Sequence, residues 1–127
     1  MRLVLVEPDR LQAKLYADAL RADGWSVRHA HSAQSALNAL DTELPDVIVL
    51  EIDMPAHNGL EFLYEFRTYD DWSHIPIVVH SSLAPSLWER MVVSWDELNV
   101  REYLYKPECT LADLQRSVRV NSVPVES

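Results

Sequence analysis

The chain has few cysteines and few glycines: Cys109 is the one cysteine, and Gly24 and Gly59 are the two glycines, among 127 residues. A single cysteine excludes an intramolecular disulfide and a cysteine-based zinc cluster, and it favours a reducing, cytoplasmic compartment. Two widely separated glycines cannot form the glycine-rich loops that bind dinucleotides or nucleotide phosphates. No apolar run approaches the roughly 20 residues that span a bilayer, so no contact with a membrane is expected.

Positive charge is also scarce, because 11 Lys and Arg residues are set against 20 Asp and Glu residues, for a formal net charge of −9. Such a surface repels phosphate backbones, so this chain is not expected to bind nucleic acid directly. Almost half of the residues (48%) are hydrophobic, which at this length suffices for one domain without a disulfide or metal. We predict one domain over residues 1–120, followed by a C-terminal tail or linker over 121–127.

Short apolar runs alternate along the chain with segments of helical period. Strands are predicted over 2–7, 25–30, 46–51, 75–80 and 101–105. Three of these runs are almost continuous Val, Ile and Leu, which is typical of strands that are covered on both faces. Five strand–helix units in series predict an α/β fold with a doubly wound parallel sheet.

The helical segments carry recognisable ends and apolar stripes. Helices are predicted over 9–23, after Ser32, over 59–69, over 84–98 and after Thr110. The first should end at Gly24 in the left-handed conformation, and Thr110 with Asp113 has the spacing of a capping box. The first helix is expected to bury Leu11, Leu15, Tyr16 and Ala19, and the last one Leu111, Leu114 and Val118.

Polar side chains follow four of the predicted strands: Glu7, Asp9, Glu51, Asp53, Ser81 and Lys106. In a doubly wound sheet, sites form at the carboxyl ends of the strands. Several carboxylates at one edge repel one another and need a cation, which is either a divalent metal or Lys106. The Ser81 hydroxyl could bind a phosphoryl oxygen. The pattern indicates a phosphoryl or Mg²⁺ site, with a solvated rim of unrelated charges as the alternative.

Four segments match, in order, the motifs of a known family. They are LVLVEPD (3–9), PDVIVLEIDMPAHNGLEFL (45–63), IPIVVHSS (75–82) and YLYKP (103–107). On these motifs the chain resembles the CheY-like receiver domains of two-component response regulators, from Arg2 to about Val120. The resemblance implies a flavodoxin-like sheet of five parallel strands in the order 2-1-3-4-5, with helices on both faces. It also implies a signalling module rather than an enzyme, whose partners are a histidine kinase or a downstream effector.

The resemblance assigns roles to individual residues. Glu51 stands at the position of the phosphoacceptor aspartate, and Glu7 and Pro8 stand at the positions of the two acids that hold Mg²⁺. Asp53 stands where the family supplies a metal ligand through its backbone carbonyl, and it is the rival phosphoacceptor. The positions that contact the phosphoryl group or switch with the state correspond to Ser81, Tyr103 and Lys106. A cis peptide bond before Pro107 is implied as well.

Two departures from the family pattern change the expected chemistry. Pro8 has no carboxylate, so Mg²⁺ held by Glu7, Glu51 and Asp53 is expected to bind weakly, and no cofactor is required. Asp9 is instead expected to start the first helix.

Glu51 is one methylene longer than Asp, which misplaces its oxygens for in-line attack but lets the carboxylate reach Lys106 and Ser81. We therefore predict an atypical receiver that signals by protein–protein contact without normal aspartate phosphorylation.

Two other functions remain open at this point. One is a phosphorylatable receiver that uses Glu51 or Asp53, and the other is a flavodoxin-like domain that binds a small ligand. Trp88 and Trp95 lie on a predicted fourth helix with more apolar residues than one buried stripe needs. Burial in the core is the simpler interpretation of both, but in the family this face, with strand 5 and helix 5, forms dimers. They are therefore candidates for a homodimer interface.

Overall fold

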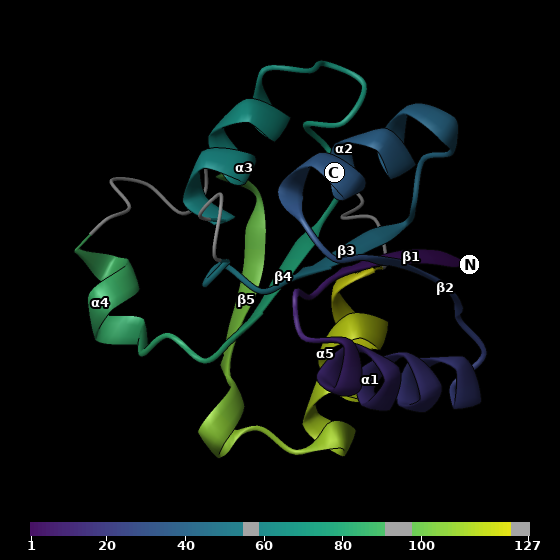
Figure 1. Ribbon diagram of the computed structural model, residues 1–127, viewed down its shortest axis with the longest axis vertical. Coiled ribbons are helices and arrows are strands. Elements are labelled where there is room, and N and C mark those ends of the chain that lie inside the picture. Colours follow the sequence, from purple (N-terminus) through teal and green to yellow (C-terminus); the bar gives the residue numbers. More distant parts are fainter. Residues whose placement is uncertain (55–58, 91–97, 123–127) are drawn as a thin grey trace.

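The computed structural model describes residues 1–54, 59–90 and 98–122, apart from the side chain of Trp88. The strands are β1 (Arg2–Val6), β2 (Ser26–Ala30), β3 (Val47–Leu50), β4 (Ile77–Ser81) and β5 (Val100–Tyr105). The helices are α1 (Arg10–Ala22), α2 (Ala33–Thr42), α3 (Gly59–Arg67), α4 (Pro85–Glu89) and α5 (Leu111–Asn121). Strands and helices alternate along the chain, as the sequence pattern predicts (Figure 1).

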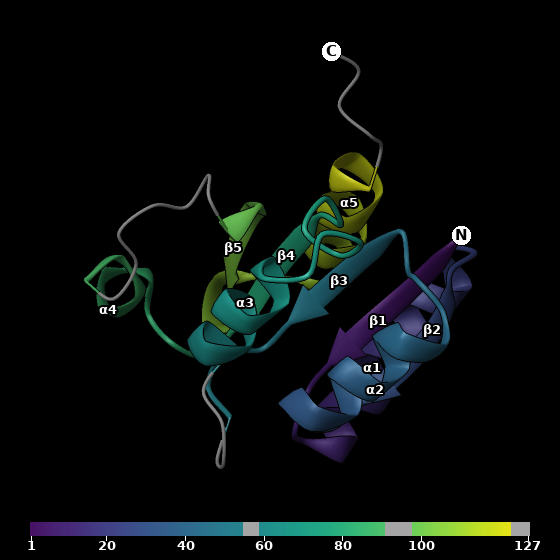
Figure 2. The ribbon, with the colours of Figure 1, turned by 90° about the horizontal axis from the view of Figure 1, so that it is seen from above.

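The five strands form one parallel sheet in the order β2-β1-β3-β4-β5, which confirms the predicted fold class. Figure 2 shows β1, β3, β4 and β5 following one another across the molecule. All residues of β3 and β4 are buried, because helices cover both faces of the central strands. This explains why β3 and the first three residues of β4 are aliphatic without alternation. The edge strand β2 is mostly exposed and carries charged and polar residues.

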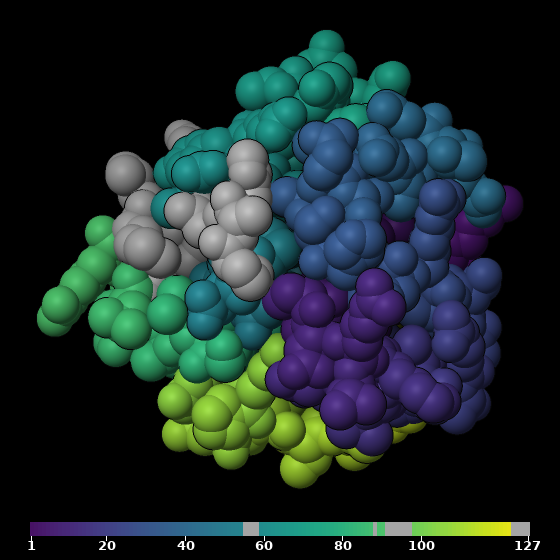
Figure 3. All heavy atoms as spheres, in the orientation of Figure 1, coloured from purple at the N-terminus to yellow at the C-terminus, as the bar shows by residue number. Residues whose placement is uncertain are grey.

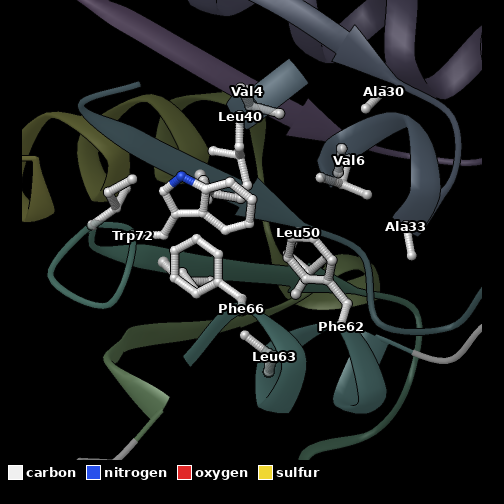
Figure 4. Packing of buried hydrophobic residues seen from close by; sticks show 14 of the residues in the cluster. Val4, Val6, Ala30, Ala33, Leu40, Leu50, Phe62, Leu63, Phe66 and Trp72 are labelled. Atoms are coloured by element: carbon white, nitrogen blue, oxygen red, sulfur yellow. The ribbon is translucent and has the colours of Figure 1, made fainter. Parts of the chain in front are cut away.

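The two faces of the sheet have different cores. On one face α1 and α5 pack over aliphatic side chains, which include Leu3, Leu5, Val47, Val49 and Val78. On the other face α2 and α3 cover Val4, Val6, Ile48, Leu50, Ile77 and Val79 (Figure 1). This second core contains aromatic rings: Phe66 stacks on Phe62 at 5.9 Å and on Trp72 at 6.2 Å between ring centroids (Figure 4).

The buried face of α1 differs from the predicted one. Tyr16 is buried as expected, but Leu11 is 84% exposed and Leu15 is 52% exposed. The helix instead buries Ala13, Tyr16, Ala17 and Leu20. The face with Ala13 and Ala17 therefore packs on the sheet, and the face with Leu11 and Leu15 meets solvent. In α5, Leu114 and Val118 are buried as predicted, whereas Leu111 is 37% exposed.

The predicted helix ends are confirmed where side chains cap them. Asp9, Ser32 and Thr110 are the N-caps of α1, α2 and α5, and Thr110 forms the capping box with Asp113. Gly24 has φ +96°, the left-handed conformation that lets the chain leave α1.

Three predictions about boundaries and bonds need correction. The peptide bond between Lys106 and Pro107 is trans, and these residues begin a short 3-10 turn in which Pro107 supplies its fixed φ. The helix α4 ends at Glu89 rather than near Leu98, which is buried just before β5; residues 91–97 lie outside the described residues.

The predicted tail is the third correction, because α5 includes Asn121 and the buried Ser122 caps it. Asn121 is also held by a hydrogen bond from its Nδ2 to Glu102 (3.3 Å). Residues 123–127 of the predicted tail lie outside the described residues.

Candidate functional site

The carboxyl ends of β1, β3, β4 and β5 bring four of the predicted site residues to one edge of the sheet. Glu7 follows β1 and Glu51 follows β3, and these side chains are only 3% and 4% exposed. Ser81 ends β4, and Lys106 follows β5. Parallel pairing of neighbouring strands explains this convergence, because it places the residues that leave each strand side by side.

Lys106 binds both buried carboxylates. Its Nζ donates to Glu7 Oε1 at 2.5 Å and to Glu51 Oε1 at 3.0 Å, and it also donates to Gln12 Oε1 at 3.0 Å. An ammonium group has three protons, so these contacts use all of its donors. Burial alone would lower the pKa of Lys106. Hydrogen bonds and negative charge from Glu7 and Glu51 outweigh burial and hold the pKa above its ordinary value, so the amine stays protonated.

The Glu51 carboxylate accepts hydrogen bonds on both of its oxygens. Oε1 accepts from Lys106, from the Ser82 backbone N–H at 3.0 Å and from the Ser82 hydroxyl at 3.2 Å. Oε2 accepts from the Asp53 backbone N–H at 3.2 Å. Burial raises the pKa of Glu51, but hydrogen bonds from Ser81, Ser82 and Lys106, with the lysine charge, outweigh it and hold the pKa below its ordinary value. Glu51 is therefore a carboxylate at neutral pH.

Two rings close the inner side of this cluster. The Tyr16 hydroxyl donates to Gln12 Oε1 at 2.9 Å, and Lys106 Nζ lies 5.6 Å from the centre of the Tyr16 ring. His80 meets Tyr16 edge-on at 4.6 Å between ring centres. Burial and then the nearby Lys106 charge lower the pKa of His80 to about 4. His80 is therefore a neutral buried ring at pH 7, which avoids a second cation in this cluster.

Ser81 and Tyr103 both meet the segment that follows β4. The Ser81 hydroxyl accepts a hydrogen bond from the Leu83 backbone N–H at 3.0 Å. The Tyr103 hydroxyl donates to the Leu83 backbone oxygen at 2.5 Å, and burial raises the pKa of this hydroxyl. Both contacts fix the backbone of Leu83, and the preceding residue, Ser82, binds Glu51. The position of this segment is therefore linked to the Glu51 carboxylate.

The structure separates the predicted acids into two groups. Glu7 and Glu51 lie in the cluster, whereas Asp9 accepts the Gln12 N–H at 3.0 Å as the helix cap. Asp53 is an exposed residue, and its contact with the cluster is the hydrogen bond from its backbone N–H to Glu51 Oε2. Pro8 contributes no carboxylate.

The sequence assigned no role in the cluster to four residues that lie around it: Gln12, Tyr16, Ser82 and His80. Tyr16 was expected only to be buried in the first helix, and His80 and Ser82 only to flank Ser81 at the end of a strand. Gln12 and Tyr16 are four residues apart in the first two turns of α1, directly after Glu7, so helical spacing could have pointed to them. Ser82 acts partly through its backbone, which no side-chain pattern reveals. His80 points inward because its position in β4 faces α1.

Comparison with known proteins decides the family. Residues 3–119 match the response regulator receiver domain family. This chain belongs to that family. Receiver domains are signalling modules of two-component systems, where they interact with histidine kinases and effectors.

Among the described residues, no helix has the length and apolar character that crossing a membrane requires.

Relatives of this receiver domain include a transcriptional regulatory protein and a response regulator. It is 29% identical over 118 residues to the KDP operon transcriptional regulatory protein KdpE of Escherichia coli (strain K12), covering 93% of this chain and 49% of KdpE. It is 33% identical over 107 residues to the response regulator MprA of Mycobacterium avium (strain 104), covering 84% of this chain and 45% of MprA. The chain thus spans about half the length of these relatives.

A solved structure with the same fold is the receiver domain of the sensor histidine kinase PA1611 from Pseudomonas aeruginosa PAO1, which has a magnesium ion coordinated in its active site cleft. The TM-score is 0.82 at 21% identity, over 95% of this chain and 96% of that one. At this identity the likeness shows the fold alone.

The side chains that the resemblance assigns to a magnesium site are engaged in other contacts in this structure. Glu7 and Glu51 are both bound to the Lys106 ammonium, which already occupies the space between the two carboxylates with positive charge. Pro8 has no side-chain oxygen, and the Asp9 carboxylate is used by the helix cap. Across residues 1–54, 59–90 and 98–122, no group of three or more His, Cys, Asp or Glu side chains is placed to hold a metal.

The interface candidates are only partly described. Trp88 lies on α4, and Trp95 lies outside the described residues. A shallow groove on the same side of the molecule runs between Pro85, Tyr103, Tyr105 and Arg116. Leu87, two residues after Pro85 in α4, is 48% exposed. This region therefore offers apolar surface.

Proposed function

We propose that this receiver domain is atypical and transmits its signal through protein–protein contacts without phosphorylation of an aspartate. The observation that carries the proposal is the contact of the Glu51 carboxylate with Lys106 (3.0 Å) and the Ser82 backbone N–H (3.0 Å). By the family resemblance, Lys106 would contact a phosphoryl oxygen. A negatively charged group of the chain itself takes that donor here, so Glu51 imitates part of the phosphorylated state.

Phosphoryl transfer to Glu51 would face two obstacles. An attacking oxygen needs an unshared electron pair directed in line at the phosphorus, and the extra methylene of Glu51 moves both of its oxygens away from the positions of an aspartate's oxygens. Glu51 Oε1 in addition already accepts three hydrogen bonds. The reaction also needs positive charge on the transferred group, which a metal usually supplies. Lys106 is engaged with Glu7, Glu51 and Gln12, and Pro8 removes one metal ligand, so we expect Mg²⁺ to bind weakly.

The partners that this proposal implies are a histidine kinase or a downstream effector. Because relatives such as KdpE and MprA are about twice as long, such an effector could be a further domain of the same protein. A homodimer through α4, β5 and α5 is the second contact that we propose, supported by exposed Leu87 and half-buried Tyr103 and Tyr105. Size-exclusion chromatography with light scattering measures this dimer directly.

The decisive experiment is incubation with acetyl phosphate and Mg²⁺, followed by intact-mass measurement. We expect the wild-type chain to gain no stable phosphoryl group. The matched control is the double variant Pro8→Asp with Glu51→Asp, which restores both family acids and should gain one phosphoryl group. The same pair can be titrated with beryllofluoride and Mg²⁺, with tryptophan fluorescence as the readout; only the double variant should respond.

A phosphoryl adduct on the wild-type chain would contradict the proposal, and two single variants then identify the acceptor. Loss of the adduct in Glu51→Gln would establish a glutamyl phosphate. Loss in Asp53→Asn would establish the exposed aspartate as the acceptor.

A further inference from the structure

A groove with acidic edges lies at the amino ends of the strands, opposite the Glu51 site. It runs between the last turn of α2 and the segment that joins α3 to β4. Figure 3 shows that segment (teal, top) lying against α2 (blue). Its floor is formed by Leu40 and Trp72, and its apolar walls by Leu44 and Tyr69, which are 43% and 44% exposed. The groove therefore offers apolar surface to a molecule that enters it.

Trp72, which lines this groove, carries a buried hydrogen-bond donor in its indole N–H group. Trp72 is only 7% exposed, and its ring packs on Phe66 and against Tyr69, whose ring centroid lies 4.2 Å away. Figure 4 shows the indole nitrogen on the edge of the ring that is turned away from Phe66. No residue in the described part of the chain accepts a hydrogen bond from this N–H group. A buried donor of this kind normally has a partner.

Three aspartates surround the groove: Asp41, Asp70 and Asp71. All three are exposed, and within residues 1–54, 59–90 and 98–122 their carboxylates form no ion pair and no hydrogen bond. No Lys, Arg or His is among the described residues that line the groove. The negative charge here is thus not balanced by neighbouring side chains of the chain.

We propose that this groove binds a basic, partly apolar peptide segment of a partner protein. A backbone carbonyl of the peptide accepts the Trp72 N–H, and its Lys or Arg side chains lie beside Asp70, Asp71 and Asp41. Apolar side chains of the same segment pack on Leu44 and Tyr69. A peptide explains these features together because it carries an acceptor, a cation and an apolar group within a few residues. A free amine or a metal ion would leave the indole donor without a partner.

This proposal is independent of the chemistry at Glu51, because the two regions lie at opposite ends of the strands. A domain that is phosphorylated and one that is not would both present the groove. A phosphoryl adduct in the acetyl phosphate experiment would therefore not contradict peptide binding in the groove. Absence of peptide binding would likewise not contradict the proposal that the chain is not phosphorylated.

The test uses a short synthetic peptide of alternating arginine and leucine, capped at both ends, titrated into the isotope-labelled chain and followed by NMR. We expect the Trp72 indole resonance to shift, together with the amides of 40–44 and 68–72. The matched probe has glutamate in place of each arginine, and it should not bind. The variant Trp72→Phe keeps an aromatic ring, smaller than the indole, and removes the donor; it assigns the resonance and should weaken binding about fivefold.

Charge is tested by the double variant Asp70→Asn with Asp71→Asn, which should weaken binding about tenfold. The control removes the same number of charges outside the groove, as Glu89→Gln with Glu108→Gln, and should change affinity less than about twofold. Equal weakening by both pairs would overturn the proposal, since general attraction to an acidic surface would explain the binding. An unmoved Trp72 indole resonance, or equal binding of the glutamate peptide, would overturn it as well.

Discussion

The strand-end cluster and the groove beside α2 both collect negative charge, but they treat it in opposite ways. In the cluster, the Glu7 and Glu51 side chains are 3% and 4% exposed, and each is bound to Lys106. In the groove, Asp41, Asp70 and Asp71 are exposed and have no cation among the described residues. One region satisfies its charges within the chain, and the other leaves them available.

The difference follows from the cost of removing charges from water. A buried carboxylate requires a partner and hydrogen bonds, because desolvation otherwise exceeds what folding supplies. An exposed carboxylate keeps its water and needs no partner in the fold. Charges in the cluster should therefore control stability, whereas those in the groove should control recognition.

The largest expected effect is the loss of the cation in the cluster. Lys106→Met leaves the Glu7 and Glu51 carboxylates buried without a counter-charge, and we expect the free energy of unfolding to fall by about 3–5 kcal/mol. Urea denaturation measures it. The control is Lys14→Met at an exposed ion pair, which should be indistinguishable from wild type.

A double-mutant cycle sharpens this prediction. Adding Glu51→Gln to Lys106→Met removes one of the two uncompensated charges, so the double variant should lose less than the sum of the single losses. Additive losses, or a single Lys106→Met loss below about 1 kcal/mol, would show that the charges in the cluster are not coupled as the contacts indicate.

A smaller effect is expected from pH, through His80 in the cluster. Burial and then the Lys106 charge lower its pKa from 6.5 to about 4. Between these values the unfolded chain binds the proton and the folded chain does not, so the stability from this group is present above pH 6.5 and is lost as pH falls toward 4.

From pH 7 to pH 5 we expect a loss of about 2 kcal/mol in the free energy of unfolding from His80 alone. His80→Leu removes this titration, so its stability should decrease less over the same range in urea denaturation. Parallel curves for the variant and wild type would show that His80 is protonated equally in the folded and unfolded chains.

The smallest effect on stability is expected in the groove. Asp70→Asn with Asp71→Asn should change the free energy of unfolding by less than about 0.5 kcal/mol, since both side chains are exposed and unpaired among the described residues. A loss above about 2 kcal/mol would mean that these aspartates support the fold. The contrast between stability and recognition would then fail.

Much of the cluster was predictable, and its missing members have physical reasons. The strand-end positions of Glu7, Glu51 and Lys106 follow from parallel pairing, so their convergence and the Glu51–Lys106 contact could be expected. Ser82 binds Glu51 partly through its backbone N–H, and the sequence carries no pattern for backbone donors. The trans bond before Pro107 likewise depends on the conformation of the segment after β5.

The groove beside α2 could not be predicted from the sequence either. Asp70 and Asp71 are plain in the sequence as an acidic pair, but nothing there indicates that they line one groove with Asp41 of α2 and Trp72. The exposure of Leu11 was also unexpected, because a helix with apolar residues on two sides can dock either one.

The alternation of strands and helices, the parallel sheet and the caps at Asp9, Ser32 and Thr110 could be predicted from the order of the residues, because apolar period and short-range hydrogen bonds are local properties. Tertiary structure alone decided which charges meet a partner and which face water. Burial and pairing depend on residues far apart in the chain, such as Glu7 and Lys106, and become definite only when the strands and helices pack.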